Sequence, residues 1–123
     1  MTLGEFLKRE AGSQEPWNCS TLPADWCISL GHPDFARRWR HIVTNKAIKR
    51  ATRHGLVRLW HRGILRSMPI ITAPYQTGDV AIVAAYGHEA GAIFTGQRWA
   101  LRMQIGVMFV APDQVNVLKA WRP

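Results

Sequence analysis

The chain has 123 residues, of which 47% are hydrophobic, and it carries a formal net charge of +8. This length predicts one domain that buries roughly two thirds of the surface of its unfolded chain, so a second domain is not expected. No run of 18 apolar residues occurs, which argues against a membrane span, and residues 1–16 carry acidic side chains where a signal peptide has an apolar core. We therefore expect synthesis in the cytoplasm.

The N-terminal segment has the pattern of a short amphipathic helix over residues 2–10. Thr2 is positioned to cap it, and Leu3, Phe6 and Leu7 form one apolar side. The polar linker AGSQEP follows and ends the helix.

A second helix is predicted over about residues 20–30, where Gly31 stops it. Pro23 is tolerated only in the first turn, so the cap must be Ser20 or the next residue. Cys19 then lies at or just before the helix N-terminus.

Both cysteines are predicted to be free thiols. Cys19 and Cys27 are eight residues apart, which is about 12 Å along a continuous helix and exceeds the roughly 7 Å that a disulfide allows between Cα atoms. The cysteines and histidines also lack the closely spaced pairs of a zinc site. We expect no metal and no cofactor.

Three more helices are predicted, over residues 33–41, 45–54 and 56–66. In the last of them the apolar residues recur with the helical period, and they are Leu56, Leu59, Trp60 and Ile64. Gly55 marks the break before it. Trp39 and Trp60 alternate with arginines, as in a surface that stacks on nucleic-acid bases, but the helical period favours buried core positions for both.

The character of the chain changes after the turn-like segment around residue 75. Short apolar runs separated by Gly, Pro and Asp follow, and they span residues 79–86, 90–96, 98–104, 106–112 and 116–122. They predict the strands of one antiparallel sheet. The last run ends in Trp121, which we expect to be buried against the cysteine-bearing helix, near Trp26.

Positive charge is concentrated in the middle of the chain. Between Phe35 and Gly78 there is no Asp or Glu, whereas 10 of the 16 basic residues lie there. This region is either a solvated surface or a site for an acidic protein, a nucleic-acid backbone or an anionic polymer, and charge alone does not choose among them. The candidate partner-binding residues are Arg37, Arg38, Arg40, Lys46, Lys49, Arg50, Arg53, Arg58 and Arg62.

The order of the motifs is more informative than any one of them. A cysteine at the head of an apolar helix precedes basic helices, the run GDVAIV, the run GAIFTG and a last run that ends in AWR. This order resembles the NlpC-type branch of papain-like cell-wall cysteine peptidases, and more closely a small phage-encoded branch found among tail-tip genes. The matching residues, within about residues 15–123, are Trp17, Cys19, Ala24, Asp25, Trp26, Gly31, His32, Pro33, Asp34, Gly78, Asp79, Val80, Val83, Gly96, Ala120, Trp121 and Arg122.

The resemblance implies a catalytic role for Cys19. A helix N-terminus lowers the pKa of a thiol, the thiolate attacks an amide carbonyl, nearby N–H groups hold the oxyanion, and a histidine protonates the departing amine. The position of that histidine in active relatives falls on Ala90. His88 lies two residues earlier, on the same face of a strand, and is the candidate base. The Asp that precedes the family's cysteine is Asn18 here.

The displaced histidine favours a degenerate site in which Cys19 is a packing thiol. We expect an α+β fold with N-terminal helices and a cysteine-bearing helix packed on a C-terminal antiparallel sheet, papain-like and of the NlpC type. One domain spans residues 1–123, with an N-terminal helix and linker (1–14), a helical half (15–68) and a sheet (69–123).

The expected function is that of a structural component of a phage tail tip or baseplate hub, located in the virion tail tip and made in the host cytoplasm. Its expected partners are tail or baseplate proteins with acidic surfaces. One alternative is an active cell-wall cysteine peptidase or amidase that acts on host peptidoglycan during phage entry. The other alternative is a basic nucleic-acid-binding module. As a partner, nucleic acid is less favoured than an acidic tail or baseplate protein.

Overall fold

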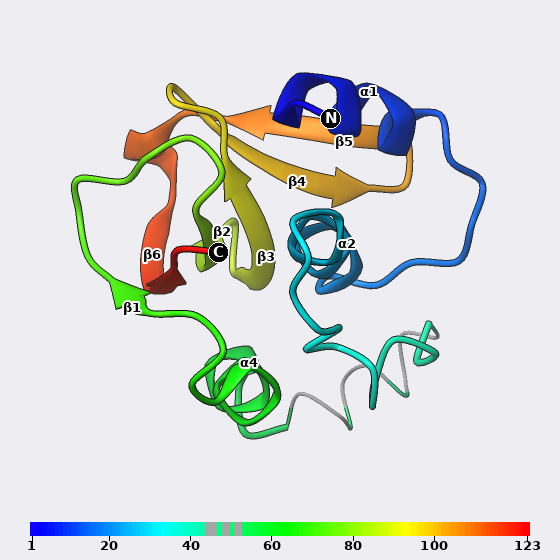
Figure 1. The fold of residues 1–123 in the computed structure, drawn as a ribbon, viewed down its shortest axis with the longest axis vertical. Helices are drawn as coiled ribbons and strands as arrows, with labels where there is room; N and C mark the ends of the chain where they lie inside the picture. Colours follow the sequence, from blue (N-terminus) through cyan, green and yellow to red (C-terminus); the bar gives the residue numbers. More distant parts are fainter. Residues whose placement is uncertain (44–46, 48–49, 51–52) are drawn as a thin grey trace.

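The computed structural model describes residues 1–43, 47, 50 and 53–123. Within this part of the chain three α-helices, α1 (Leu3–Ala11), α2 (Thr21–Ser29) and α4 (Leu56–Ile64), precede a six-stranded sheet (Figure 1). The strands are β1 (Ile70–Ile71), β2 (Val80–Ala85), β3 (His88–Phe94), β4 (Trp99–Met103), β5 (Gly106–Val110) and β6 (Asn116–Trp121), with the short 3₁₀ helix η1 (Pro112–Gln114) before the last. The predicted α+β class and the antiparallel sheet are confirmed.

The sheet has the order β1-β6-β2-β3-β4-β5, and every neighbouring pair is antiparallel. The strand β2 is central: it pairs along its whole length with β3, from Val80 opposite Ile93 to Ala85 opposite His88. Its other neighbour, β6, closes the sheet from the C-terminal end of the chain, with a register shift between Ile82 and Val83.

The helix ends follow from local sequence. Thr2 caps α1, since its Oγ1 accepts a hydrogen bond from the N–H of Glu5 at 3.2 Å. The helix α2 stops at Gly31, whose φ of 94° is the left-handed conformation that glycine adopts most readily. The N–H groups of Gly31 and His32 then bond back to the carbonyls of Ile28 and Cys27, which is the Schellman arrangement.

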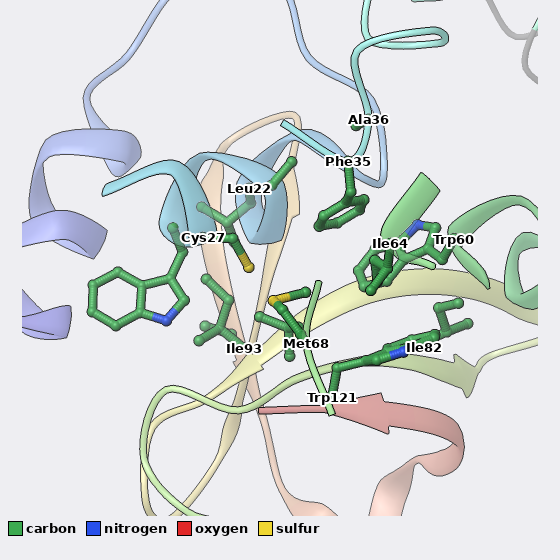
Figure 2. Packing of buried hydrophobic residues seen from close by; sticks show 14 of the residues in the cluster. Leu22, Cys27, Phe35, Ala36, Trp60, Ile64, Met68, Ile82, Ile93 and Trp121 are labelled. Atoms are coloured by element: carbon green, nitrogen blue, oxygen red, sulfur yellow. The ribbon is translucent and has the colours of Figure 1, made fainter. Parts of the chain in front are cut away.

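Both faces of the sheet are packed with apolar side chains. The helix-facing side joins the three helices to strand residues that include Val80, Ile82, Ile93, Ala100 and Trp121, as Figure 2 shows for part of this cluster. The far side carries a separate cluster that includes Ala81, Val83, Ala92, Trp99, Leu101 and Ala120. Because strand residues alternate between faces, these two clusters assign the other residues of β2, β3, β4 and β5 to one side, whereas the register shift interrupts the alternation in β6.

The helix predicted over residues 33–41 is wrong, because residues 35–41 form turns. The carbonyl oxygens of Trp39, within this segment, and of Ile42, just after it, accept hydrogen bonds from the side-chain amide of Asn18 at 2.9 and 3.1 Å. A tertiary hydrogen-bond donor thus binds carbonyls that a continuing helix would use itself. The helix predicted over 45–54 falls mostly outside the described residues.

The expected burial of Trp121 is confirmed, but its expected neighbour is wrong. Its indole is fully buried and lies 5.7 Å, between ring centroids, from that of Trp60 in α4 (Figure 2). Trp26 of α2 packs instead on Phe6 of α1, at 5.4 Å. The aromatic contact of the last strand is therefore with α4. Trp39 and Trp60 are both buried, as predicted.

None of the helices in the described part of the chain combines the length and the apolar character that a membrane crossing requires.

Candidate functional site

The segment that carries Cys19 is fixed by a buried asparagine. Asn18 Oδ1 accepts from the N–H of Ser20 at 2.8 Å, while its Nδ2 donates to the carbonyls of the 39–42 turns. The hydroxyl of Thr21 accepts from the N–H of Asn18 and donates to the carbonyl of Asn18. Cys19 therefore lies just before α2, as predicted, with Pro23 in the first turn of the helix.

The backbone at Cys19 lies directly on β3. Its carbonyl oxygen accepts a hydrogen bond from the N–H of Gly91 at 3.0 Å. A Cβ atom built on Gly91 would lie 2.5 Å from this oxygen, 2.6 Å from the ring of Trp60 and 2.9 Å from Pro23. Only glycine fits here, so Gly91 sets the close approach of α2 to the sheet.

The Cys19 thiol is half-buried and is not activated. Burial is the dominant effect and raises the pKa of Cys19 above its usual value; hydrogen bonds with Ser20 and with its own backbone lower the pKa by less, and the negative charge of Glu89 adds a still smaller increase. Desolvation and a nearby carboxylate both disfavour a thiolate. At neutral pH Cys19 is therefore a protonated thiol.

The structure does not bring His88 to Cys19. His88 is the exposed first residue of β3, and it shares its side of the strand with Ala90 and Ala92. Those alanines pack in the cluster on the far side of the sheet, whereas Gly91 meets Cys19 on the helix-facing side. The pairing of β2 with β3 has no bulge that could reverse this alternation. The sequence argument erred in assuming that the face of position 90 looks toward the cysteine.

The charged β3 side chain on the Cys19 side of the sheet is Glu89. Its Oε1 accepts a hydrogen bond from the N–H of Leu56 at 3.0 Å, at the start of α4. Gly55, the N-cap residue of this helix, has no side chain to cap it, so Glu89, which is 33 residues after Leu56 in the sequence, takes that role. Sequence analysis missed Glu89 because nothing local to residues 55–56 points to a distant cap.

The indole N–H groups of two buried tryptophans hold α2 in place. Trp60 Nε1 donates to Ser20 Oγ at 2.8 Å, and Trp26 Nε1 donates to the carbonyl of Gly78 at 3.0 Å. These two bonds attach the N-terminal end of α2 to α4 and the middle of α2 to the start of β2. Both indole nitrogens thereby acquire the partner that a buried indole N–H requires.

The GDV and AWR motifs meet in an ion pair between a buried carboxylate and a partly exposed arginine. Asp79 is 1% exposed, and both of its carboxylate oxygens accept hydrogen bonds from Arg122 at 2.9 Å. The carboxylate also accepts from the N–H of Gln76 at 2.7 Å. Such a bidentate pair holds the end of β6 beside the start of β2. These motif residues thus stabilise the fold.

The basic surface is largely exposed. We use this name for seven arginines of the middle segment that are exposed and that have no carboxylate within ion-pair distance in the described structure: Arg37, Arg38, Arg50, Arg53, Arg58, Arg62 and Arg66. Lys46 and Lys49 lie outside the described residues.

Arg40 differs from the other candidate partner-binding residues. Its guanidinium forms ion pairs with Asp34 at 2.8 Å and with Asp25 at 2.7 Å. The hydrogen bond to Asp34, followed by the charge of Asp25, raises the pKa of Arg40 above its usual value. This arginine ties the 35–41 turns to α2, so much of its charge is already neutralised inside the chain.

In the part of the chain that the structure describes, no three His, Cys, Asp or Glu residues are grouped so that they could hold a metal ion. The site therefore consists of an unactivated thiol against the sheet and, elsewhere, a surface of uncompensated positive charge.

These features define an α+β domain with a packed cysteine helix. Residues 2–123 match the family model described as "Domain of unknown function (DUF6950)", and the chain belongs to this family. Comparison with the curated proteins and with the solved structures gave no match.

Proposed function

We propose that this chain is a non-catalytic structural domain of a phage tail tip or baseplate hub, with an NlpC-like peptidase fold whose chemistry has been lost. The tail placement rests on the resemblance of the ordered sequence motifs. The loss of chemistry rests on one observation: the sheet presents Gly91 and Glu89 to Cys19, while His88 extends from the other face.

This arrangement disfavours the alternative of an active peptidoglycan peptidase. A cysteine nucleophile needs a cation near its sulfur, usually an imidazolium, to stabilise the thiolate and to protonate the leaving amine. Cys19 has a carboxylate as its charged neighbour, and that charge acts in the opposite direction. The residues that match the peptidase motifs, such as Asp79, Trp121 and Arg122, are engaged in packing and ion pairing within the domain.

The basic surface supports an acidic protein as the partner. Its arginines are exposed and lack internal carboxylates, so a negatively charged surface could pair with them on contact. The competing class, a module that stacks on nucleic-acid bases, loses its aromatic platform because Trp39 is only 7% exposed and Trp60 is fully buried.

The test is a pull-down of the phage's other tail proteins with the full chain, repeated over a series of salt concentrations. Binding should weaken as salt rises, because exposed charge pairs are screened. The variant Arg62→Gln should bind more weakly than the control Arg98→Gln, which removes the same charge elsewhere on the surface. Salt-independent binding, or equal binding by the two variants, would refute the proposed role of this surface. Tighter binding to DNA or RNA than to any tail protein would favour the nucleic-acid alternative.

A further inference from the structure

The strand β5 ends the sheet with an unprotected edge. At the opposite edge β1 has only two residues, whereas β5 has five, with the sequence GVMFV and neither a charge nor a proline. Phe109 in β5 is 47% exposed, and Ile105 in the preceding turn is 98% exposed. Long apolar edges without charges are normally avoided, because their free backbone groups pair with other chains.

An apolar pocket of about 480 Å³ lies beside this edge, between α1 and β5. Leu3 and Leu7 of α1 form one side, and Val107 and Phe109 of β5 form the other. The pocket is on the helix-facing side of the sheet, where Val107 and Phe109 point. A strand added to β5 would therefore carry every second side chain over the pocket.

We propose that two copies of this chain associate through β5, which pairs antiparallel with the same strand of the partner about a two-fold axis at Met108. Met108 is the central residue of β5, so this register centres the contact on residues 107–109, while Gly106 is buried beside Ala11 at the end of α1. It sets Val107 opposite the partner subunit's Phe109, with both side chains on the pocket side. Each copy thus supplies an exposed phenylalanine and receives the other, as a self-complementary interface requires.

The distribution of charge permits this pairing despite the net charge of +8. Figure 1 shows α1 and β5 at one end of the molecule and α4, which carries part of the basic surface, at the other end. Exposed charges separated by more than about 10 Å are largely screened at ordinary ionic strength. On α1, which covers the pocket, Glu5 lies in the first turn and Lys8 in the last turn, while Arg9 is already paired with Glu10 at 3.5 Å. In the proposed dimer the two-fold axis runs the two copies of α1 antiparallel, so Glu5 of one copy lies toward the partner subunit's Lys8.

The experiment measures the mass of the full chain in solution by light scattering over a concentration series. The wild type should show a monomer–dimer equilibrium. The variant Phe109→Lys should weaken the dimer by at least about tenfold, since each interface would enclose two unpaired ammonium groups. Ile105→Lys should weaken it as well, and its 98% exposure means that the substitution cannot disturb the core. The control Leu118→Lys adds the same charge at a residue of β6 that is about as exposed as Phe109 and is separated from β5 by three strands of the sheet, and it should leave the dimer unchanged.

A wild-type chain that is monomeric at all concentrations would overturn the proposal, as would assembly beyond the dimer. A dimer that survives both edge variants, or that is weakened equally by Leu118→Lys, would show that the contact lies elsewhere and would also overturn it. The Phe109→Lys and Ile105→Lys proteins should melt at the temperature of the control, which separates loss of association from loss of the fold.

Discussion

Asn18 connects three parts of the chain through one buried side chain. It is 3% exposed, its amide nitrogen donates to carbonyls of residues 39–42, and its amide oxygen accepts from Ser20. An aspartate, which stands before the cysteine in the peptidase family that the sequence resembles, accepts hydrogen bonds but does not donate them when ionised. The asparagine is therefore matched to the turn that replaces the predicted 33–41 helix.

We predict that Asn18→Asp destabilises the domain by about 2–4 kcal/mol, because it buries a carboxylate against carbonyl oxygens. Asn116→Asp makes the same chemical change at an exposed position of β6 and should cost less than about 0.5 kcal/mol. Urea denaturation of the two variants measures both values. Equal stability of the variants would contradict the role assigned to Asn18.

The second cysteine makes a prediction about alkaline pH. Burial raises the pKa of Cys27 from 9.0 to about 12. Between these values the unfolded chain loses the thiol proton before the folded chain does, so the free energy of unfolding should fall as pH rises, by up to about 1.4 kcal/mol per pH unit. Cys27→Ala should lack this contribution and keep only the loss that comes from the raised pKa of Cys19.

Denaturation of the wild type and of Cys27→Ala at about pH 8 and about pH 10 isolates this effect, since the other titrating groups are common to both proteins. Cys27→Ala should be less stable than the wild type at the lower pH, because loss of the buried sulfur leaves a cavity. The difference in the free energy of unfolding between the two proteins should narrow at the higher pH. A difference that is independent of pH would refute the assignment.

At the scale of elements, the contact of α2 with β3 determines the geometry of the candidate site. It depends on Gly91, where the carbonyl of Cys19, the ring of Trp60 and Pro23 occupy the space that a side chain would take. The close contact also explains why Cys19 is desolvated: its backbone is hydrogen-bonded to the sheet.

Gly91→Ala should therefore be strongly destabilising, by about 2–4 kcal/mol, because two of the three clashes are below 2.7 Å and involve a backbone oxygen and a packed indole. The matched control is Gly4→Ala in α1, where an added Cβ would meet nothing closer than 3.9 Å. This substitution should be neutral or slightly stabilising. Thermal melts of both variants test this. A Gly91→Ala protein as stable as the control would mean that α2 does not lie on β3 in this way.

Elements with local signals could be predicted from the sequence. These signals depend on residues close to the element that they define. They are the cap at Thr2, the helix stop at Gly31, and the Gly, Pro and Asp residues that separate the apolar runs of the strands. The segment 33–41 has a helical composition, but its carbonyls bond to Asn18. That bond is set by tertiary structure, so the local pattern could not reveal it.

The candidate site was harder to predict than the fold. The position of Cys19 before α2 followed from Pro23 and the glycine stop. Which side chains of β3 face α2 could not be predicted from the sequence. Both faces of residues 90–94 are packed, so polar and apolar residues do not alternate there and no residue can be assigned to a side. The two candidate catalytic residues, Cys19 and His88, therefore lie on opposite sides of the sheet, and the sequence analysis overlooked Glu89.

At the scale of the whole molecule, the C-terminal strand completes the fold. Trp121 is fully buried against Trp60, and Arg122 pairs with the buried carboxylate of Asp79. Trp121→Ala should cost about 3–5 kcal/mol, more than Trp17→Ala, since Trp17 is only half-buried. Deletion of residues 115–122 should leave the domain insoluble or without a cooperative melt. A shortened chain with an unchanged melting temperature would contradict this placement of β6.

The central claim is that Cys19 is a packing thiol and not a nucleophile, and the most direct test is its rate of alkylation by iodoacetamide as a function of pH. The reaction can be followed by mass spectrometry of the peptide that contains Cys19. Burial and Glu89 raise the pKa of this thiol above 9.0, so alkylation should be slow at neutral pH, should rise only above about pH 9, and should be unaffected by His88→Ala. A rate that has already reached its plateau near about pH 7, and that falls in His88→Ala, would demonstrate a thiolate–imidazolium pair and contradict the account.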